Sequence, residues 1–127
     1  MAMTWSNANN KAACDARAAR LNGGFIDIYT AGFAALLARV GLGGTAFGAG
    51  TSATPSVATA GAMTRDEDAA AGGTAAKFRL VAGDGTTVEA EGDVTLAGGG
   101  GDLTLVGTLT IAAGQPFEIA SFAIAQS

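Results

Sequence analysis

Hydrophobic and polar residues alternate along the segment 74–96, TAAKFRLVAGDGTTVEAEGDVTL. A period of two gives each strand one apolar and one polar face, and the Asp-Gly pair between the two runs is typical of a tight turn with a positive φ. The segment therefore predicts a β-hairpin. On its polar faces we expect Lys77 and Arg79 to lie opposite Glu89 and Glu91, since such pairs help to fix strand register.

A different pattern occupies the first 24 residues, where an arm precedes one predicted helix. Ser6 can cap a helix over 7–21, and an Asn-Gly-Gly sequence follows as its end. The helix has one narrow apolar stripe, formed by Cys14, Ala18 and Leu21. Because this stripe is small, the helix must pack against the rest of the chain, and Cys14 is expected to be a packing residue and not a nucleophile.

Short strand patterns recur at nearly regular spacing over residues 25–127. They cover 25–30, 36–42, 56–64, both arms of the hairpin, 102–111 and the segment from 117. Near residues 120–121 the apolar positions switch parity, which implies either a β-bulge or a strand that passes from one sheet to the other. The pattern predicts an all-β, jelly-roll-like antiparallel β-sandwich over 25–127, preceded by an N-terminal arm and one short α-helix over 1–24.

The strand patterns also predict which side chains are buried between two sheets. These core residues are Phe78, Leu80, Leu103, Leu105, Phe117 and Phe122. Phe47 is expected to anchor the Gly-rich loop 43–55. Asp27, which lies between two aromatic residues, is expected at a solvated edge or an interface.

Charge is unevenly distributed along the 127 residues. The net charge of −4 divides into an excess of two positive charges over residues 1–40 and of six negative charges over 41–127. The acidic body argues against nucleic acid as a partner, because phosphate binding needs clustered Lys and Arg. The basic N-terminal segment could dock on an acidic protein surface, although a simple solvated helix face is the favoured interpretation of the charges alone.

Candidate chemistry is sparse. The chain has no His and one Cys, which excludes Ser-His-Asp and Cys-His sites and an intrachain disulfide, and no cofactor or metal is expected. The acidic run 66–68 lacks the spacing of a calcium loop, and the Gly-rich stretches 41–46 and 98–102 are weak matches to ligand-binding motifs. We therefore expect no enzyme.

No membrane or export signal is expected either. Residues 1–10 lack the basic and apolar regions of a signal peptide, and the longest apolar run, 31–40, is too short to cross a bilayer. These features predict a soluble protein made in the cytoplasm, with no membrane partner.

The order of four motifs resembles a known family. They are LNGGFIDIYT (21–30), LLARVGLGGTAFGAG (36–50), GTAAKFRLVAGDGTTVEAEGDV (73–94) and GGDLTLVGTLTIAAGQPFEIASFAIA (100–125). Together they resemble small tailed-phage virion proteins, namely jelly-roll head cement (decoration) proteins of the type found in Bordetella tropism-switching phages. The resemblance implies a protein on the outside of an HK97-like capsid that ties neighbouring major capsid subunits together, as a homodimer more readily than a trimer.

With this resemblance, the chain is expected to be a structural virion protein on the outer capsid surface, made in the host cytoplasm. Its partners would be the phage major capsid protein and a second copy of itself. The expected contact residues are Trp5, Lys11, Arg17 and Arg20, one aromatic anchor beside a basic helix. The alternative is a phage tail or receptor- or carbohydrate-binding β-sandwich module, which would need an exposed aromatic cluster, whereas Trp5 and Tyr29 are the only Trp and Tyr.

Overall fold

The computed structural model describes residues 5–53, 56–96, 98–105, 108–119 and 121–126. The elements in chain order are α1 (Asn7–Arg20), β1 (Phe25–Tyr29), the 3-10 turn η1 (Ala31–Phe33), β2 (Leu36–Leu42), β3 (Ser56–Thr59), β4 (Met63–Thr64), β5 (Gly73–Thr74), β6 (Lys77–Val81), β7 (Val88–Leu96), β8 (Leu103–Leu105), β9 (Thr110–Ile111) and β10 (Ala123–Gln126). The prediction of a mostly β protein with one N-terminal helix is confirmed.

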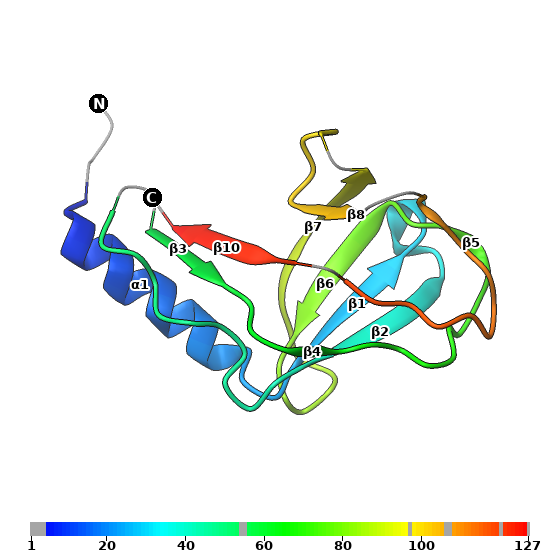
Figure 1. The fold of residues 1–127 in the computed structure, drawn as a ribbon, viewed down its shortest axis with the longest axis horizontal. Coiled ribbons are helices and arrows are strands. Elements are labelled where there is room, and N and C mark those ends of the chain that lie inside the picture. The colour runs from blue at the N-terminus through cyan, green and yellow to red at the C-terminus, as the bar shows by residue number, and fades with distance from the viewer. Residues whose placement is uncertain (1–4, 54–55, 97, 106–107, 120, 127) are drawn as a thin grey trace.

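Helix α1 begins where its capping residue predicts. The Ser6 hydroxyl accepts a hydrogen bond from the backbone N–H of Asn9 at 3.1 Å, which satisfies one of the free donors of the first turn. Cys14, Ala18 and Leu21 are all buried, which confirms the predicted apolar stripe. Figure 1 shows the helix alongside the β3–β10 ribbon, which it contacts.

Six strands form the main sheet in the order β4-β2-β1-β6-β7-β8. It is antiparallel except at one end, where β8 runs parallel to β7, with Val94 opposite Leu103. The expectation of a purely antiparallel sandwich is therefore wrong at this edge. Gly98 and Gly100 both have positive φ, a conformation that glycine adopts freely. They lie in the segment that connects the end of β7 to the start of β8.

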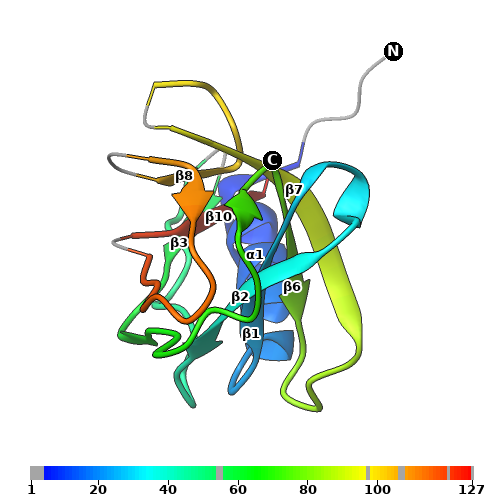
Figure 2. The same ribbon diagram turned by 90° about the vertical axis from the view of Figure 1, so that its right-hand side faces the viewer.

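The sheet is curled, and two short ribbons complete the body. Figure 2 shows β7 bending over toward β8, with α1 behind the sheet. The ribbons are β10 with β3 and β5 with β9. The result is a sandwich-like, mostly β body.

The C-terminal segment changes its partner along its length. Phe117 forms an isolated antiparallel bridge with Asp66, whereas β10 pairs with β3. This agrees with the second of the two alternatives for the parity switch, a chain that passes from one part of the β structure to another. Ala120, at the predicted switch, lies outside the described residues.

The core contains the side chains that the alternation predicts. All six predicted core residues are buried, with exposed fractions of 9% or less. The Phe122 ring lies 5.6 Å from that of Phe78 and 6.1 Å from that of Phe47, which is itself buried as expected. These contacts join the β3–β10 ribbon to the main sheet.

The hairpin has the predicted cross-strand charges, in a shifted register. Arg79 lies opposite Glu91 and binds it at 2.6 Å, while Lys77 lies opposite Asp93 and forms an ion pair with it. Glu89 does not pair across the hairpin. A bulge between Leu80 and Val81 displaces Glu89 from the ladder, so the carboxylate binds Arg20 of α1 instead.

Asp27 is the clearest correction to the sequence analysis. It is 2% exposed on β1, which has neighbours on both sides, and it is therefore not at a solvated edge. Arg39, directly opposite on β2, binds both carboxylate oxygens at 2.7 and 2.8 Å and also reaches the Gly85 carbonyl at 3.0 Å. The alternation showed which face Asp27 occupies but not that a cation on the next strand covers it.

Phe78→Ala is expected to lower the free energy of unfolding by roughly 3 to 5 kcal/mol, because it removes a buried ring that touches Phe122. Chemical denaturation measures this loss. Val88→Ala is the matched control, since Val88 is 45% exposed and its truncation should change stability by about 0.5 kcal/mol or less. Equal losses in the two variants would contradict the assignment of Phe78 to the core.

Arg39→Met is expected to cost about 3 kcal/mol, because it leaves the Asp27 carboxylate buried without its charged partner. Adding Asp27→Asn to that variant should restore part of the loss, since no buried charge then remains unpaired. A double-mutant cycle by urea unfolding measures the coupling. Strictly additive losses would mean that the two side chains do not depend on each other.

Candidate functional site

The four predicted contact residues do not share one face. Lys11 and Arg20 are nine positions apart, which on an α-helix places them about 180° from each other. Lys11 binds Asp15 at 2.8 Å, and Trp5, which precedes α1, is 50% exposed. The structure brings Arg17 and Arg20 together and leaves Lys11 on the other side of the helix.

Arg17 and Arg20 line a hollow of about 510 Å³ between the helix and the strands, here called the α1–β7 hollow. Its lining residues are Arg17, Arg20, Leu21, Leu80, Glu89, Ala90, Ile124 and Ala125. Aliphatic side chains from Leu21, which follows α1, and from β6, β7 and β10 make up most of this surface. The two arginines and Glu89 supply its charge.

A bidentate ion pair crosses this hollow. Arg20 donates to both oxygens of Glu89 at 2.8 and 2.9 Å, which ties the end of α1 to β7. The hydrogen bond from Arg20 holds the pKa of the Glu89 carboxyl below its usual range, so the pair is charged at neutral pH. Arg17 is exposed and has no ion-pair partner among the described residues. Of the two arginines that line the hollow, Arg17 is therefore the one available to bind an acidic group of another molecule.

One edge of β7 next to the hollow is open. Strand β8 covers only residues 94–96 of β7, so residues 88–92 pair with β6 on one side and with no described strand on the other. The Val94 N–H donates to the Ala76 carbonyl next to β6. In an antiparallel ladder, successive residues turn their backbone groups alternately toward and away from the partner strand. Glu91, three positions from Val94, therefore points its N–H and C=O away from β6. We call residues 88–92 the open edge of β7. Sequence analysis missed it, because alternation does not tell an edge strand from a central one.

The inner side of this edge is uncovered. Ala90 lies directly opposite Leu80 and therefore on the same face of the sheet. Leu80 is buried, yet Ala90 is exposed, because the α1–β7 hollow lies over it. The site thus combines unpaired backbone groups with an adjacent apolar recess.

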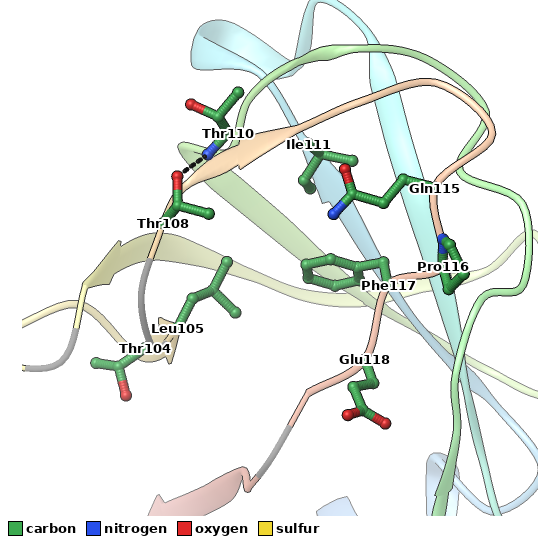
Figure 3. A pocket seen from close by; sticks show the side chains of 9 residues that line it. All are labelled: Thr104, Leu105, Thr108, Thr110, Ile111, Gln115, Pro116, Phe117 and Glu118. Atoms are coloured by element: carbon green, nitrogen blue, oxygen red, sulfur yellow. Dashed lines mark hydrogen bonds between the residues drawn. The ribbon is translucent and has the colours of Figure 1, made fainter.

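A second hollow, of about 280 Å³, lies at the β8–β9 end of the molecule (Figure 3). Leu105, Ile111 and Phe117 form its apolar base. Polar groups around it form hydrogen bonds with near neighbours in the chain. The Thr110 N–H donates to the Thr108 hydroxyl, and the Ala112 N–H donates to the Gln115 side chain, both at 3.0 Å. This hollow offers no cluster of reactive groups.

Aromatic residues gather on the outer face of the main sheet. The Arg79 guanidinium lies 5.0 Å from the Tyr29 ring centroid and 4.4 Å from that of Phe33, and Arg39 lies 4.6 Å from the Phe25 ring. Phe25 and Tyr29 share one face of β1, but sequence analysis did not join them to Phe33, Arg39 and Arg79, which come from other elements. Since the guanidinium groups pack on the rings, this cluster is not an open platform on which a sugar could stack.

The acidic run 66–68 has a structural role at Asp66. Its carboxylate accepts hydrogen bonds from the backbone N–H groups of Arg39 and Asp68, each at 2.9 Å. Within the described residues, no group of three or more His, Cys, Asp or Glu side chains could hold a metal ion. No helix in that part of the chain is long and apolar enough to cross a bilayer.

Comparisons with protein-family models, with curated proteins and with solved structures gave no significant match to this chain. The site must therefore be interpreted from its own geometry. That geometry is a strand edge, an apolar recess and a basic helix end, an arrangement suited to binding a polypeptide.

Arg17→Ala and Arg20→Ala are each expected to change the free energy of unfolding by about 1 kcal/mol or less, because both side chains are exposed and surface ion pairs contribute little. Thermal unfolding at low and at moderate salt measures this. A loss as large as that expected for Phe78→Ala would show that Arg20 is needed for the fold and would disqualify it as a binding probe.

Proposed function

We propose that the protein is a structural virion protein, a jelly-roll-like cement or decoration protein that binds the outside of an HK97-like phage head and stabilises contacts between major capsid subunits. The four motifs that resemble such proteins support this proposal. The structural observation that carries it is the open edge of β7 beside the α1–β7 hollow. A bare strand edge with an apolar recess suits non-covalent binding of another chain.

The proposed capsid contact uses the residues near α1. Arg17, which has no ion-pair partner among the described residues, offers its charge to an acidic protein surface, and Trp5 offers a large exposed anchor for the capsid or for a neighbouring copy. Arg20 and Lys11 contribute less in this scheme, because each already has a carboxylate partner within the chain. Binding through Arg17 should weaken as salt rises.

The second candidate function is a phage tail module that binds a receptor or carbohydrate. The aromatic residues on the outer face of the main sheet are the observation that bears on it. Arg79 packs on Tyr29 and Phe33, and Glu91 pairs with Arg79, so these groups already bind one another. This favours the capsid proposal over the tail module.

Fractionation of phage particles tests the function directly. Heads and tails are separated, and the protein is detected in each fraction with an antibody. The proposal predicts the protein on heads, accessible to antibody from outside and absent from tails. Its presence in tails alone would support the second candidate and refute the first.

Arg17→Glu is expected to lower the affinity for purified heads about fivefold or more, because it replaces a positive side chain with a negative one that an acidic surface would repel. Co-sedimentation with heads at several salt concentrations measures the effect. Arg65→Glu is the matched control, since Arg65 is also exposed but lies after β4, outside the hollow. Equal binding by the two variants would contradict a role for Arg17.

A further inference from the structure

We propose that residues 1–6 of a second copy add as an extended strand along the open edge of β7, with their large side chains in the α1–β7 hollow. The result is a homodimer that exchanges its N-terminal segments. The proposal goes beyond the proposed function, because this self-association does not depend on a capsid.

The receiving surface has the two features that strand addition requires. Glu91 presents its backbone N–H and C=O away from β6, as the alternation of the ladder requires. Beside it, Ala90 is exposed on the face where its opposite neighbour Leu80 is buried. The main-chain groups can bind a guest strand, and the recess can take every second side chain of that strand.

The N-terminal segment has the matching pattern. Large residues at positions 1, 3 and 5, Met1, Met3 and Trp5, alternate with the small residues Ala2, Thr4 and Ser6. In an extended strand, this period of two places all three large side chains on one face. Residues 1–4 lie outside the described part of the chain, and Trp5 is half exposed.

Charge favours the N-terminal segment, and not the β7 edge of a second copy, as the strand that binds the open edge. Residues 1–10 contain no acidic side chain, whereas the open edge carries Glu89 and Glu91. If two copies joined through their β7 edges, acidic residues would be brought close to acidic residues. The N-terminal segment has no acidic side chain and meets no such repulsion.

Reach shows that a Trp5 side chain beside β7 must come from a second copy. With a rise of 1.5 Å per residue, Arg17 is about 15 Å and Arg20 about 20 Å along the helix from Asn7. Trp5 is two residues from Asn7, so its backbone can lie no more than about 7 Å away. Trp5 therefore cannot lie beside β7 in its own chain. Figure 1 shows the first turn of α1 at the opposite end of the helix from β7.

Trp5 is the only Trp, so its fluorescence reports on docking without a label. The full-length protein is diluted from about 100 to about 1 μM, a range suited to detecting micromolar dissociation constants. We expect a dimer by sedimentation at the high end, with blue-shifted Trp5 emission protected from acrylamide, and both features lost together on dilution. Emission and quenching that do not change while the protein remains a monomer would overturn the proposal.

Two substitutions at one position test the strand edge. Glu91→Pro removes the N–H that faces the guest strand, whereas Glu91→Ala removes the same carboxylate and keeps that N–H. We expect Glu91→Pro to weaken dimerisation about tenfold or more relative to Glu91→Ala. Equal dimerisation by the two variants, or a dimer that persists unchanged in Trp5→Ala, would overturn the proposal.

A peptide assay covers the case in which Glu91→Pro does not fold. A peptide of residues 1–8 is titrated with the full-length Trp5→Ala variant, which contains no other Trp, so that all emission comes from the peptide. We expect a saturable blue shift for the native peptide and none for a peptide of the same composition with the alternation scrambled. Equal responses from both peptides, or no response from either, would overturn the proposal.

Discussion

The position of the β3–β10 ribbon over the main sheet depends on one aromatic contact. Phe122, just before β10, packs edge-on against Phe78 of β6 and also lies close to Phe47. Across the hairpin from Phe78 is Gly92, where an added Cβ would lie 2.6 Å from the Phe78 ring. A side chain at position 92 would therefore displace the ring that holds the ribbon. The ribbon in turn supports α1, so the α1–β7 hollow also depends on this contact.

The two sides of the main sheet satisfy their charges differently. On the outer face, Asp27 binds Arg39, Arg79 binds Glu91, and Lys77 binds Asp93. Only the first of these pairs has a buried member, and pairs between exposed side chains add little stability. The outer face thus has its charges compensated within the chain, whereas the helix side retains Arg17 and the open edge of β7. This difference places the candidate binding surface on the helix side.

Local patterns in the sequence predicted the local structure well. The Ser6 cap and the hairpin follow from capping chemistry and periodicity, and parity identified the core residues such as Phe78. Periodicity alone did not distinguish a strand from a helix over 36–42, where the glycines at 41, 43 and 44 favoured the strand that the structure has. These features are set by residues close together in the chain. The same reasoning expected Lys77 and Arg79 to lie opposite Glu89 and Glu91, and it was wrong for Glu89, because a bulge changes the register by one residue and alternation does not show where a bulge occurs.

The remaining errors concern contacts between distant segments. The parallel addition of β8 to β7 depends on how a Gly-rich loop returns, and the burial of Asp27 depends on a cation from β2. The expectation of a single basic face on α1 was wrong for a different reason. Net charge counts Lys11 and Arg20 equally, although helical geometry separates them and each has an acidic partner. A candidate site built from charge alone was therefore only partly assembled by the fold.

The two proposals reinforce each other on a repeating surface. Among the residues that the structure describes, the helix side of a single copy offers Arg17 without an ion-pair partner and a half-exposed Trp5, which is a small area for a stable contact. Exchange of N-terminal segments would use Trp5 within the dimer and leave two Arg17 surfaces related by the symmetry of the pair. On a capsid, equivalent sites recur at fixed spacing, and two linked weak contacts can bind roughly 10²- to 10⁴-fold more tightly than one when both sites are reached at once. Self-association would then convert a weak electrostatic contact into a tether between neighbouring capsid subunits, which is what a cement protein must provide.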